Sequence, residues 1–209
     1  KKKIAILGST GSIGKSTLKV IDKNRKNFDI CFLSANNNYK ELVRQAVKYK
    51  SKNILIKNKK FYQATKKLLK KSKTKVYTGD IPINKIISYK LDYTMSAIVG
   101  LAGLQPTIDS VKISKNLAIA NKETIICGWE IISKLKKKFN TNILPVDSEH
   151  FSINELTKDV SNDQIEEIII TASGGPFLKM PLSKIKKVKP NQAIKHPNWK
   201  MGKKISVDS

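Results

Sequence analysis

Short apolar runs alternate with longer segments of helical period over residues 1–145. Apolar runs bounded by turn residues are typical of strands buried in a parallel sheet, and the amphipathic segments between them are typical of crossover helices. The pattern predicts strands at residues 4–7, 30–34, 53–56, 75–77, 93–99, 117–120 and 142–145. It predicts helices at residues 15–23, 40–50, 61–71, 106–113 and 123–139. The expected fold class is therefore α/β, with a Rossmann-like, doubly wound parallel sheet.

The rhythm of the chain changes after residue 145. A polar helix is expected at 151–158, and the run EEIIITAS predicts a strand at 166–173 that ends in two glycines. Residues 178–204 are rich in Lys and Pro and have little periodicity, which is typical of a functional or disordered loop. We therefore expect a first domain at residues 1–146 and part of a second, α+β domain at residues 147–209.

A glycine-rich turn, GSTGSIG, follows the first predicted strand and opens the first predicted helix. Glycines at positions 8, 11 and 14 permit a tight turn, close approach of backbone N–H groups to phosphate, and close packing of helix on strand. The turn therefore predicts a nucleotide phosphate site. Gly14, Lys15 and Ser16 also match the end of a Walker A loop, but that loop needs glycine at position 9, which is Ser9. A P-loop nucleotide hydrolase is thus one alternative.

The end of the second predicted strand indicates which dinucleotide is bound. NAD-binding folds usually carry an acid there, which hydrogen-bonds the ribose 2′-hydroxyl. Here the strand ends in SANNNYK, so amides at Asn36, Asn37 and Asn38, with Lys40 nearby, replace the acid. Because these groups accept a 2′-phosphate that a carboxylate would repel, NADP is favoured over NAD.

Two carboxylates, Asp147 and Glu149, follow the seventh predicted strand in PVDSEHF. They lie at the carboxyl edge of the sheet, where open α/β sheets bind ligands. Hard oxygen ligands without cysteine suit Mg²⁺ or Mn²⁺, although an octahedral ion needs further ligands. The alternative is that Asp147 caps the following helix and Glu149 is an acid of its first turn.

Other polar groups stand at strand ends or in loops. Lys122, in IANKETII, ends a strand beside two polar partners and could stabilise an oxyanion. Ser173, in TASGGPF, could hold an oxyanion or belong to a plain tight turn. The segment HPNWKMGKK carries His196, Trp199 and Met201 without amphipathic period, so it predicts a lid or, alternatively, a satellite core cluster.

The chain carries 41 Lys and Arg against 16 Asp and Glu, a formal charge of +25. Only Arg25 and Arg44 are arginines, and the lysines are scattered rather than gathered on one segment. Nucleic-acid readers usually concentrate charge and use Arg, so we expect a solvated lysine background and no nucleic-acid partner. A basic module that binds polyanions or nucleic acid is the second alternative.

Cysteine use and hydropathy bear on location. Cys31 and Cys127 lie in apolar or helical patterns without metal-ligand spacing, which predicts buried, reduced thiols. No stretch approaches the roughly 20 apolar residues of a membrane span. A cytoplasmic protein without a membrane partner is expected.

Five motifs together, GSTGSIG, ANKE, PVDSEH, SGGPF and HPNWKMGKKISVDS, resemble the 1-deoxy-D-xylulose 5-phosphate reductoisomerases. These are NADPH- and metal-dependent enzymes of non-mevalonate isoprenoid synthesis. The resemblance implies rearrangement and reduction of 1-deoxy-D-xylulose 5-phosphate to 2-C-methyl-D-erythritol 4-phosphate. It also implies an NADPH-binding first domain, a metal site and a flexible flap in the second, and a homodimer.

The resemblance assigns roles to residues of this chain. It implies NADPH contacts from Thr10, Gly11, Ser12, Ile13, Asn38, Asn121, Glu123 and Gly202. It implies metal ligation by Asp147 and Glu149, and catalytic roles for these two carboxylates and Lys122. Substrate contacts are implied for Lys122, Ser148, Glu149, Ser173, His196 and Ser209, and a flap for Trp199 and Met201.

Two departures from the family pattern change the expectation. The family usually has Gly-Lys-Asn where this chain has residues 36–38, Asn-Asn-Asn, so contact with the 2′-phosphate differs in detail. The sequence also stops at Ser209, before the motif that supplies an Asn, a Lys and a third carboxylate, and before the helical C-terminal domain. We expect the chain as given to bind NADPH but to turn over substrate poorly or not at all.

Overall fold

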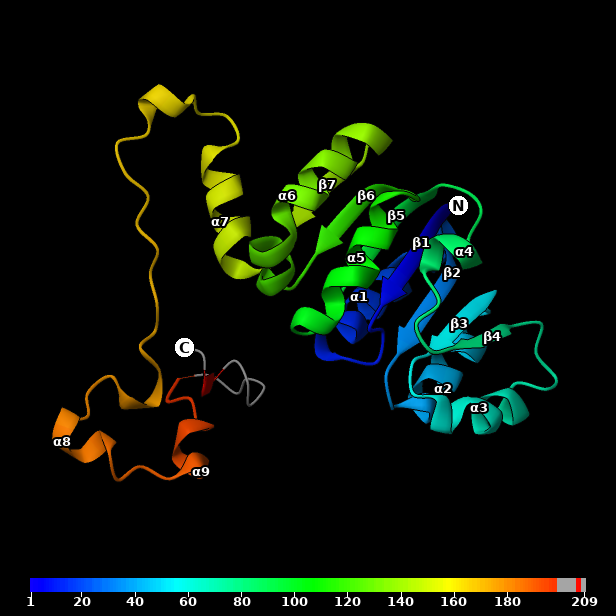
Figure 1. Ribbon diagram of the computed structural model, residues 1–209, viewed down its shortest axis with the longest axis horizontal. Coiled ribbons are helices and arrows are strands. Elements are labelled where there is room, and N and C mark those ends of the chain that lie inside the picture. Colours follow the sequence, from blue (N-terminus) through cyan, green and yellow to red (C-terminus); the bar gives the residue numbers. More distant parts are fainter. Residues whose placement is uncertain (199–205, 208–209) are drawn as a thin grey trace. The chain divides into compact units, whose positions relative to one another are not determined.

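The computed structural model describes residues 1–198 and 206–207, and it divides the chain into two compact units, Lys1–Asp159 and Val160–Ser209. The first unit contains a parallel sheet of seven strands in the order β4-β3-β2-β1-β5-β6-β7 (Figure 1). The strands are β1 (Lys2–Leu7), β2 (Phe28–Ala35), β3 (Asn53–Ile56), β4 (Lys75–Thr78), β5 (Leu91–Ser96), β6 (Ser114–Ile119) and β7 (Asn142–Pro145). All seven predicted strands are confirmed, as is the doubly wound α/β class.

Helices α1 to α6 connect successive strands of the first unit, and α7 follows the last strand. They are α1 (Ser12–Lys23), α2 (Tyr39–Tyr49), α3 (Tyr62–Leu68), α4 (Ile83–Ile86), α5 (Leu104–Val111), α6 (Lys122–Phe139) and α7 (Ser148–Thr157). Five of them match predicted helices, and α7 begins three residues earlier than the polar helix expected there. The short α4 was not predicted, because four residues after Pro82 are too few to show a helical period.

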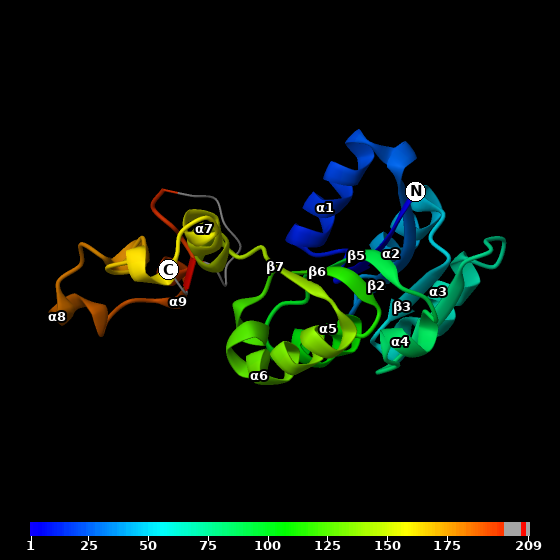
Figure 2. The ribbon, with the colours of Figure 1, turned by 90° about the horizontal axis from the view of Figure 1, so that it is seen from above.

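The side chains of the central strand β1 alternate between the two faces of the sheet. Ile4 and Ile6 pack in the core cluster that contains residues of α1 and α2, whereas Ala5 and Leu7 pack in the cluster that contains residues of α4. Figure 2 shows helices on both faces, with α1 on one side and α5 and α6 on the other. Burial on both faces explains why residues 4–7 of this strand are all apolar rather than alternating.

Two expectations about the core are wrong. The run at 166–173 forms no strand, and Ile168, Ile169 and Ile170 are exposed. A strand needs a hydrogen-bonded neighbour, and the described residues offer this run none, so its β propensity alone does not fix it. Cys127 is exposed on α6, because that helix buries the face marked by Thr124, Gly128 and Ile132 instead. Cys31 is buried, as predicted.

The second unit consists of short helical turns, among them α8 (Leu182–Ile185) and α9 (Pro190–Ala193). Contacts along the chain place α7 in the first unit, which ends at Asp159. The functional boundary after residue 146 remains a prediction. No helix in the described ranges has the length and apolar character that crossing a membrane requires.

Asp92, at the start of β5, ties three neighbouring strands together. Its Oδ2 accepts the backbone N–H of Lys3 in β1 at 2.8 Å, and its Oδ1 lies 2.8 Å from Lys115 Nζ in β6. The hydrogen bond from Lys115 and the one from the Lys3 backbone hold the pKa of the Asp92 carboxyl below its ordinary value.

We expect this carboxylate to make stability pH-dependent. Because the pKa of Asp92 is lower in the folded chain than in the unfolded one, its stabilisation is present above about pH 4 and is lost as the pH falls through the lowered pKa. Asp92→Asn should lower the free energy of unfolding at pH 6. It should also make the decrease in this free energy between pH 6 and pH 3 smaller than in the unchanged chain, as measured by urea unfolding. Asp80→Asn, at a carboxylate that is 83% exposed beside Lys57, is the control and should change little at either pH.

Candidate active site

The turn after β1 is shaped by two glycines that packing requires. Gly8 has a φ of +75°, and a Cβ there would stand 2.7 Å from the carbonyl oxygen of Ala97. A Cβ on Gly14 would overlap the carbonyl oxygen of Gly8 and the backbone of Ser9. These contacts bring the first turn of α1 directly against the end of β1, as the predicted glycine roles require.

The N-terminus of α1 is open. Gly11 is the N-cap, no side chain caps the helix, and its first turn contains no acid. A Cβ on Gly11 would meet only the Gly8 oxygen, at 3.4 Å, so packing does not demand glycine there. Ser12 and Ile13 are exposed beside it. Backbone N–H groups and the positive end of the helix dipole are therefore available to an anion.

Ser9 anchors this turn to α2. Its hydroxyl donates to Gln45 Oε1 at 2.7 Å, and Gln45 Nε2 donates back to the Ser9 carbonyl at 3.0 Å. Gln45 Nε2 also donates to Glu41, which is held by Arg44 through two 2.8 Å hydrogen bonds. Arg44 and burial act in opposite directions on the Glu41 carboxyl, and the net result is a lowered pKa. A Walker A loop needs glycine where this chain has a buried, hydrogen-bonded Ser9.

The asparagines after β2 lie at the same edge of the sheet as the glycine turn. The side chain of Asn38 caps α2 by accepting the N–H of Glu41 at 3.3 Å, and Asn37 Oδ1 accepts from Asn58 at 2.8 Å. The cap uses the oxygen of Asn38 and leaves its amide nitrogen as a donor. No acid lies in this exposed stretch of three asparagines.

Asn121 fixes the position of Lys122 after β6. Its side-chain oxygen caps α6 by accepting the N–H of Thr124 at 2.9 Å, and its amide donates to the carbonyl of Ile98. This side chain is buried and ties the loop after β5 to the start of α6. The NADPH contacts assigned to Asn121 and Glu123 stay predictions.

Asp147 and Glu149 follow β7, and the structure brings Glu149 to Lys122. Lys122 Nζ lies 3.1 Å from Glu149 Oε1, although the two residues are 27 positions apart. The contact forms because β6 and β7 are neighbours in the sheet and Lys122 and Glu149 begin the helices that follow them. The sheet thus gathers a cation and two carboxylates in one place.

The two oxygens of Asp147 have different surroundings. Oδ1 caps α7 by accepting the N–H of His150 at 3.0 Å, and it lies 2.7 Å from the Nδ1 atom of the same ring. Oδ2 is buried and has no hydrogen-bond partner among the described residues. The helix-cap interpretation is thus confirmed: Asp147 caps α7 through Oδ1, and Glu149 is an acid of its first turn. Metal ligation by these two residues stays a prediction.

His150 was not among the predicted site residues. Its i, i+3 spacing from Asp147 at the start of a helix was a signal that could have indicated the contact. Among residues 1–198 and 206–207, no group of three His, Cys, Asp or Glu side chains is placed to hold a metal. The described chain therefore offers two carboxylate ligands at this point.

In the second unit, Ser173 and His196 are brought together across 23 positions. Ser173 Oγ lies 3.0 Å from His196 Nε2 and accepts the N–H of Gly175 at 3.3 Å. Asn198 N–H donates to His196 Nδ1 at 3.1 Å, so a neutral ring carries its proton on Nε2 and donates it to Ser173. The remaining predicted residues, Trp199, Met201, Gly202 and Ser209, lie outside the described residues.

Comparison with known proteins identifies the family. The family model described as 1-deoxy-D-xylulose 5-phosphate reductoisomerase matches residues 4–128, and the model of that family's C-terminal domain matches residues 143–209. The chain belongs to the 1-deoxy-D-xylulose 5-phosphate reductoisomerase family. The P-loop and polyanion-binding alternatives predict other families, so the match argues against both.

Individual reductoisomerases agree with this assignment. The chain is 50% identical to the Pelagibacter ubique enzyme and 42% identical to that of Bacteroides fragilis, covering the whole chain and 54% of each relative. It superposes with a TM-score of 0.86 on the Zymomonas mobilis enzyme in complex with NADPH, at 34% identity. A reductoisomerase in complex with NADPH, fosmidomycin and magnesium also gives 0.86, at 30% identity. Both structures cover the whole chain, which matches 54% of each. The chain thus spans about half the length of these relatives.

Gly14 and Gly11, in the first turn and at the N-cap of α1, allow the packing of the glycine turn to be tested. Gly14→Ala should lower the free energy of unfolding by about 2 kcal/mol, because the new methyl group overlaps backbone atoms that cannot rotate away. Gly11→Ala should cost less than about 1 kcal/mol, the value expected for a changed N-cap without a clash. Urea unfolding of both variants measures the difference, and equal losses would contradict the packing role given to Gly14.

Proposed function

We propose that the enzyme containing this chain converts 1-deoxy-D-xylulose 5-phosphate to 2-C-methyl-D-erythritol 4-phosphate with NADPH and Mg²⁺ or Mn²⁺. The observation that carries the proposal is the Lys122–Glu149 contact at the sheet edge that also carries Asp147, whose Oδ2 is buried and has no partner in the described part of the chain. Family membership supplies the reaction to which this arrangement is assigned.

The glycine turn and the asparagines after β2 are the proposed NADPH site. The uncapped first turn of α1, at Gly11, Ser12 and Ile13, offers backbone donors to the pyrophosphate. Asn38 offers an amide donor, residues 36–38 carry no acid that would repel a 2′-phosphate, and the charge of Glu41, whose N–H Asn38 caps, is paired with Arg44. Thr10 lies in the same turn. This turn stands at the carboxyl edge of the sheet, where other dinucleotide-binding sheets hold their cofactor. NADPH, when bound, supplies the hydride.

The chemistry of the donors fits a divalent cation. A buried carboxylate oxygen without a partner is costly, and a hard cation relieves that cost through direct ligation. Asp147 Oδ2 is such an atom, and Glu149 supplies the second carboxylate. A bound divalent cation supplies Lewis acidity toward the carbonyl and hydroxyl oxygens of the substrate.

The chain's own residues hold this arrangement in place. His150 and the start of α7 fix Asp147 through Oδ1, which sets the direction of Oδ2. Lys122 orients Glu149 and places a positive charge where negative charge develops on a substrate oxygen. Ser148, exposed between the two carboxylates, is assigned to substrate binding with them.

In the second unit, the hydroxyl and imidazole of Ser173 and His196 suit a phosphate ester oxygen. We assign this pair to the substrate, and we assign Trp199 and Met201 to the flap, Gly202 to NADPH and Ser209 to substrate on the family pattern. The proposal includes a catalytic domain beginning at residue 147, a homodimeric whole enzyme, and a cytoplasmic location.

The cofactor preference can be tested on residues 1–209 alone. NADPH should bind at least about tenfold more tightly than NADH in a fluorescence titration, since the 2′-phosphate meets the amides of residues 36–38 where NAD-binding folds carry an acid. Asn38→Asp keeps an oxygen to cap α2 but adds a negative charge, so it should weaken NADPH binding and leave NADH binding unchanged. Equal affinities in the unchanged chain would count decisively against the proposed site.

The metal site can be tested in the whole enzyme. Asp147→Asn keeps the Oδ1 cap of α7 but removes the charge on the ligating group, so kcat/KM should fall at least about 100-fold. Mn²⁺ binding, followed by electron paramagnetic resonance, should weaken in parallel. Glu155→Gln changes an exposed carboxylate of the same helix, paired with Lys158, and is the control. Full activity of Asp147→Asn would refute the metal assignment.

A further inference from the structure

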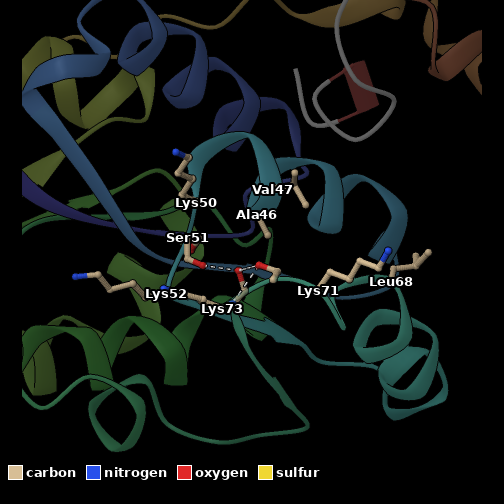
Figure 3. Close-up of a pocket in the computed structure, with 10 residues that line it drawn as sticks. Ala46, Val47, Lys50, Ser51, Lys52, Leu68, Lys71 and Lys73 are labelled. Carbon is tan, nitrogen blue, oxygen red and sulfur yellow. Dashed lines mark hydrogen bonds between the residues drawn. The ribbon is translucent and has the colours of Figure 1, made fainter.

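A hollow lies at the edge of the sheet opposite the glycine turn, away from the residues of the proposed active site. Its volume is about 550 Å³, within the usual range of small-molecule sites. The hollow is formed where α2 passes into β3 and where α3 passes into β4 (Figure 3). Since the strands are parallel, the amino ends of β3 and β4 lie away from the edge that carries Lys122 and Asp147.

Four lysines surround the hollow, namely Lys50, Lys52, Lys71 and Lys73, and no acidic residue lines it. Lys52 has an ion pair, with Asp29 at 3.5 Å. Within the described part of the chain, no carboxylate pairs with the other three. Figure 3 shows Lys50 and Lys52 on one side of the hollow and Lys71 on the other, beside Leu68. In this view their ammonium groups point away from the hollow, so the positive charge lies at its rim, on two sides.

The wall between these lysines is apolar. It is made by Ala46 and Val47 of α2 and by Leu68 of α3, and the last two are 58% and 57% exposed. Aliphatic side chains left open to solvent beside charged groups are suited to a ligand that has both an apolar body and an anionic head.

The floor of the hollow is preformed. Thr74 Oγ1 donates to the Ser51 carbonyl at 2.7 Å, and the backbone N–H of Lys75 donates to the Lys52 carbonyl at 2.8 Å. Ser51 is buried and its hydroxyl donates to the carbonyl of Asn53 at 3.0 Å. These bonds fix the two turns to each other, so a ligand would not have to order them.

Lys50 carries an additional signal in its backbone. It ends α2 in the left-handed region, with a φ of 51°, a position that usually takes glycine or asparagine. The other non-glycine residue described in this region is Asn140, which ends α6 and is of the usual type. Lysine at such a position is conformationally unfavourable, which is consistent with a use for its ammonium group.

We propose that this hollow binds a small organic anion with a phosphate head and an apolar body. The lysines hold the phosphate, and Val47 and Leu68 contact the apolar body. The inference does not depend on the function proposed above, because the residues involved and the edge of the sheet are different.

The test uses 1-naphthyl phosphate as the probe and ¹⁵N-labelled residues 1–209. We expect saturable shifts of the Ser51 and Thr74 amide signals in nuclear magnetic resonance titrations, at lower concentration than with inorganic phosphate. Shifts confined to Gly11, Ser12 and Ile13 would overturn the inference, since they would place the probe at the α1 turn instead. Equal affinity for the two probes would also overturn it.

Matched variants separate a site from general charge. Lys71→Gln with Lys73→Gln should weaken binding of the probe about fivefold, in line with the loss of two exposed charge contacts. Lys66→Gln with Lys67→Gln removes the same charge from α3 outside the lining and should leave binding unchanged. If both double variants lost the same affinity for 1-naphthyl phosphate, net charge alone would explain the binding, and the proposed site would be refuted.

Two further variants address the wall and the backbone. Val47→Ser should weaken binding of 1-naphthyl phosphate but not of inorganic phosphate. Lys50→Gly should raise the Tm by about 2 to 4 °C while weakening probe binding, because it relieves the left-handed conformation and removes one ammonium group. Unchanged binding in Lys50→Gly would contradict the role given to Lys50. NADPH titration of the same variants shows whether the first site is intact.

Discussion

Every strand of the sheet is hydrogen-bonded to its neighbours in the parallel sense, so all seven strands end at one edge. The order of the strands then decides which polar residues meet there. The glycine turn follows β1, the asparagines follow β2, and Lys122 and Asp147 follow the neighbouring strands β6 and β7. Because the sheet reverses its order beside β1, these groups can surround a ligand bound at that edge. The turns that lead into β3 and β4, at the other edge, form the hollow lined by lysines.

The two oxygens of Asp147 differ in their surroundings, and the proposed metal site depends on that difference. Oδ1 satisfies a backbone donor at the start of α7 and contacts His150, which orients the group. Oδ2 is buried and has no hydrogen-bond partner within the described ranges, which is unfavourable for a carboxylate oxygen and is the basis of the proposed cation site. A free N-cap side chain would rotate to share its oxygens with solvent. In the proposed metal site, the two contacts of Oδ1 orient the carboxylate, as the neighbours of metal ligands usually do.

The lysines that give the chain its charge of +25 fall into three groups, which differ in their surroundings. Most lysines are solvated and only add to the field that draws anions toward the protein. A few form ion pairs with single carboxylates. Lys115 pairs with Asp92 across neighbouring strands, and Lys122 pairs with Glu149 at the carboxyl edge of the sheet. Among residues 1–198 and 206–207, the lysines that line the hollow pair with no carboxylate except at Lys52, and the proposed anion site depends on that unpaired charge.

The sequence by itself determined the seven strands, five of the main helices, the phosphate turn and the two carboxylates after β7, because these depend on local periodicity and on glycine and capping chemistry. The same local rules wrongly predicted a strand at 166–173 and a buried Cys127, since pairing and helix orientation depend on neighbours far along the chain. Only the tertiary structure brought Lys122 to Glu149, Ser9 to Gln45 and Ser173 to His196. It also left Asp147 Oδ2 buried, with no partner in the part of the chain that the structure describes. Such contacts span 23 or more residues, and packing and strand order, rather than sequence spacing, decide them.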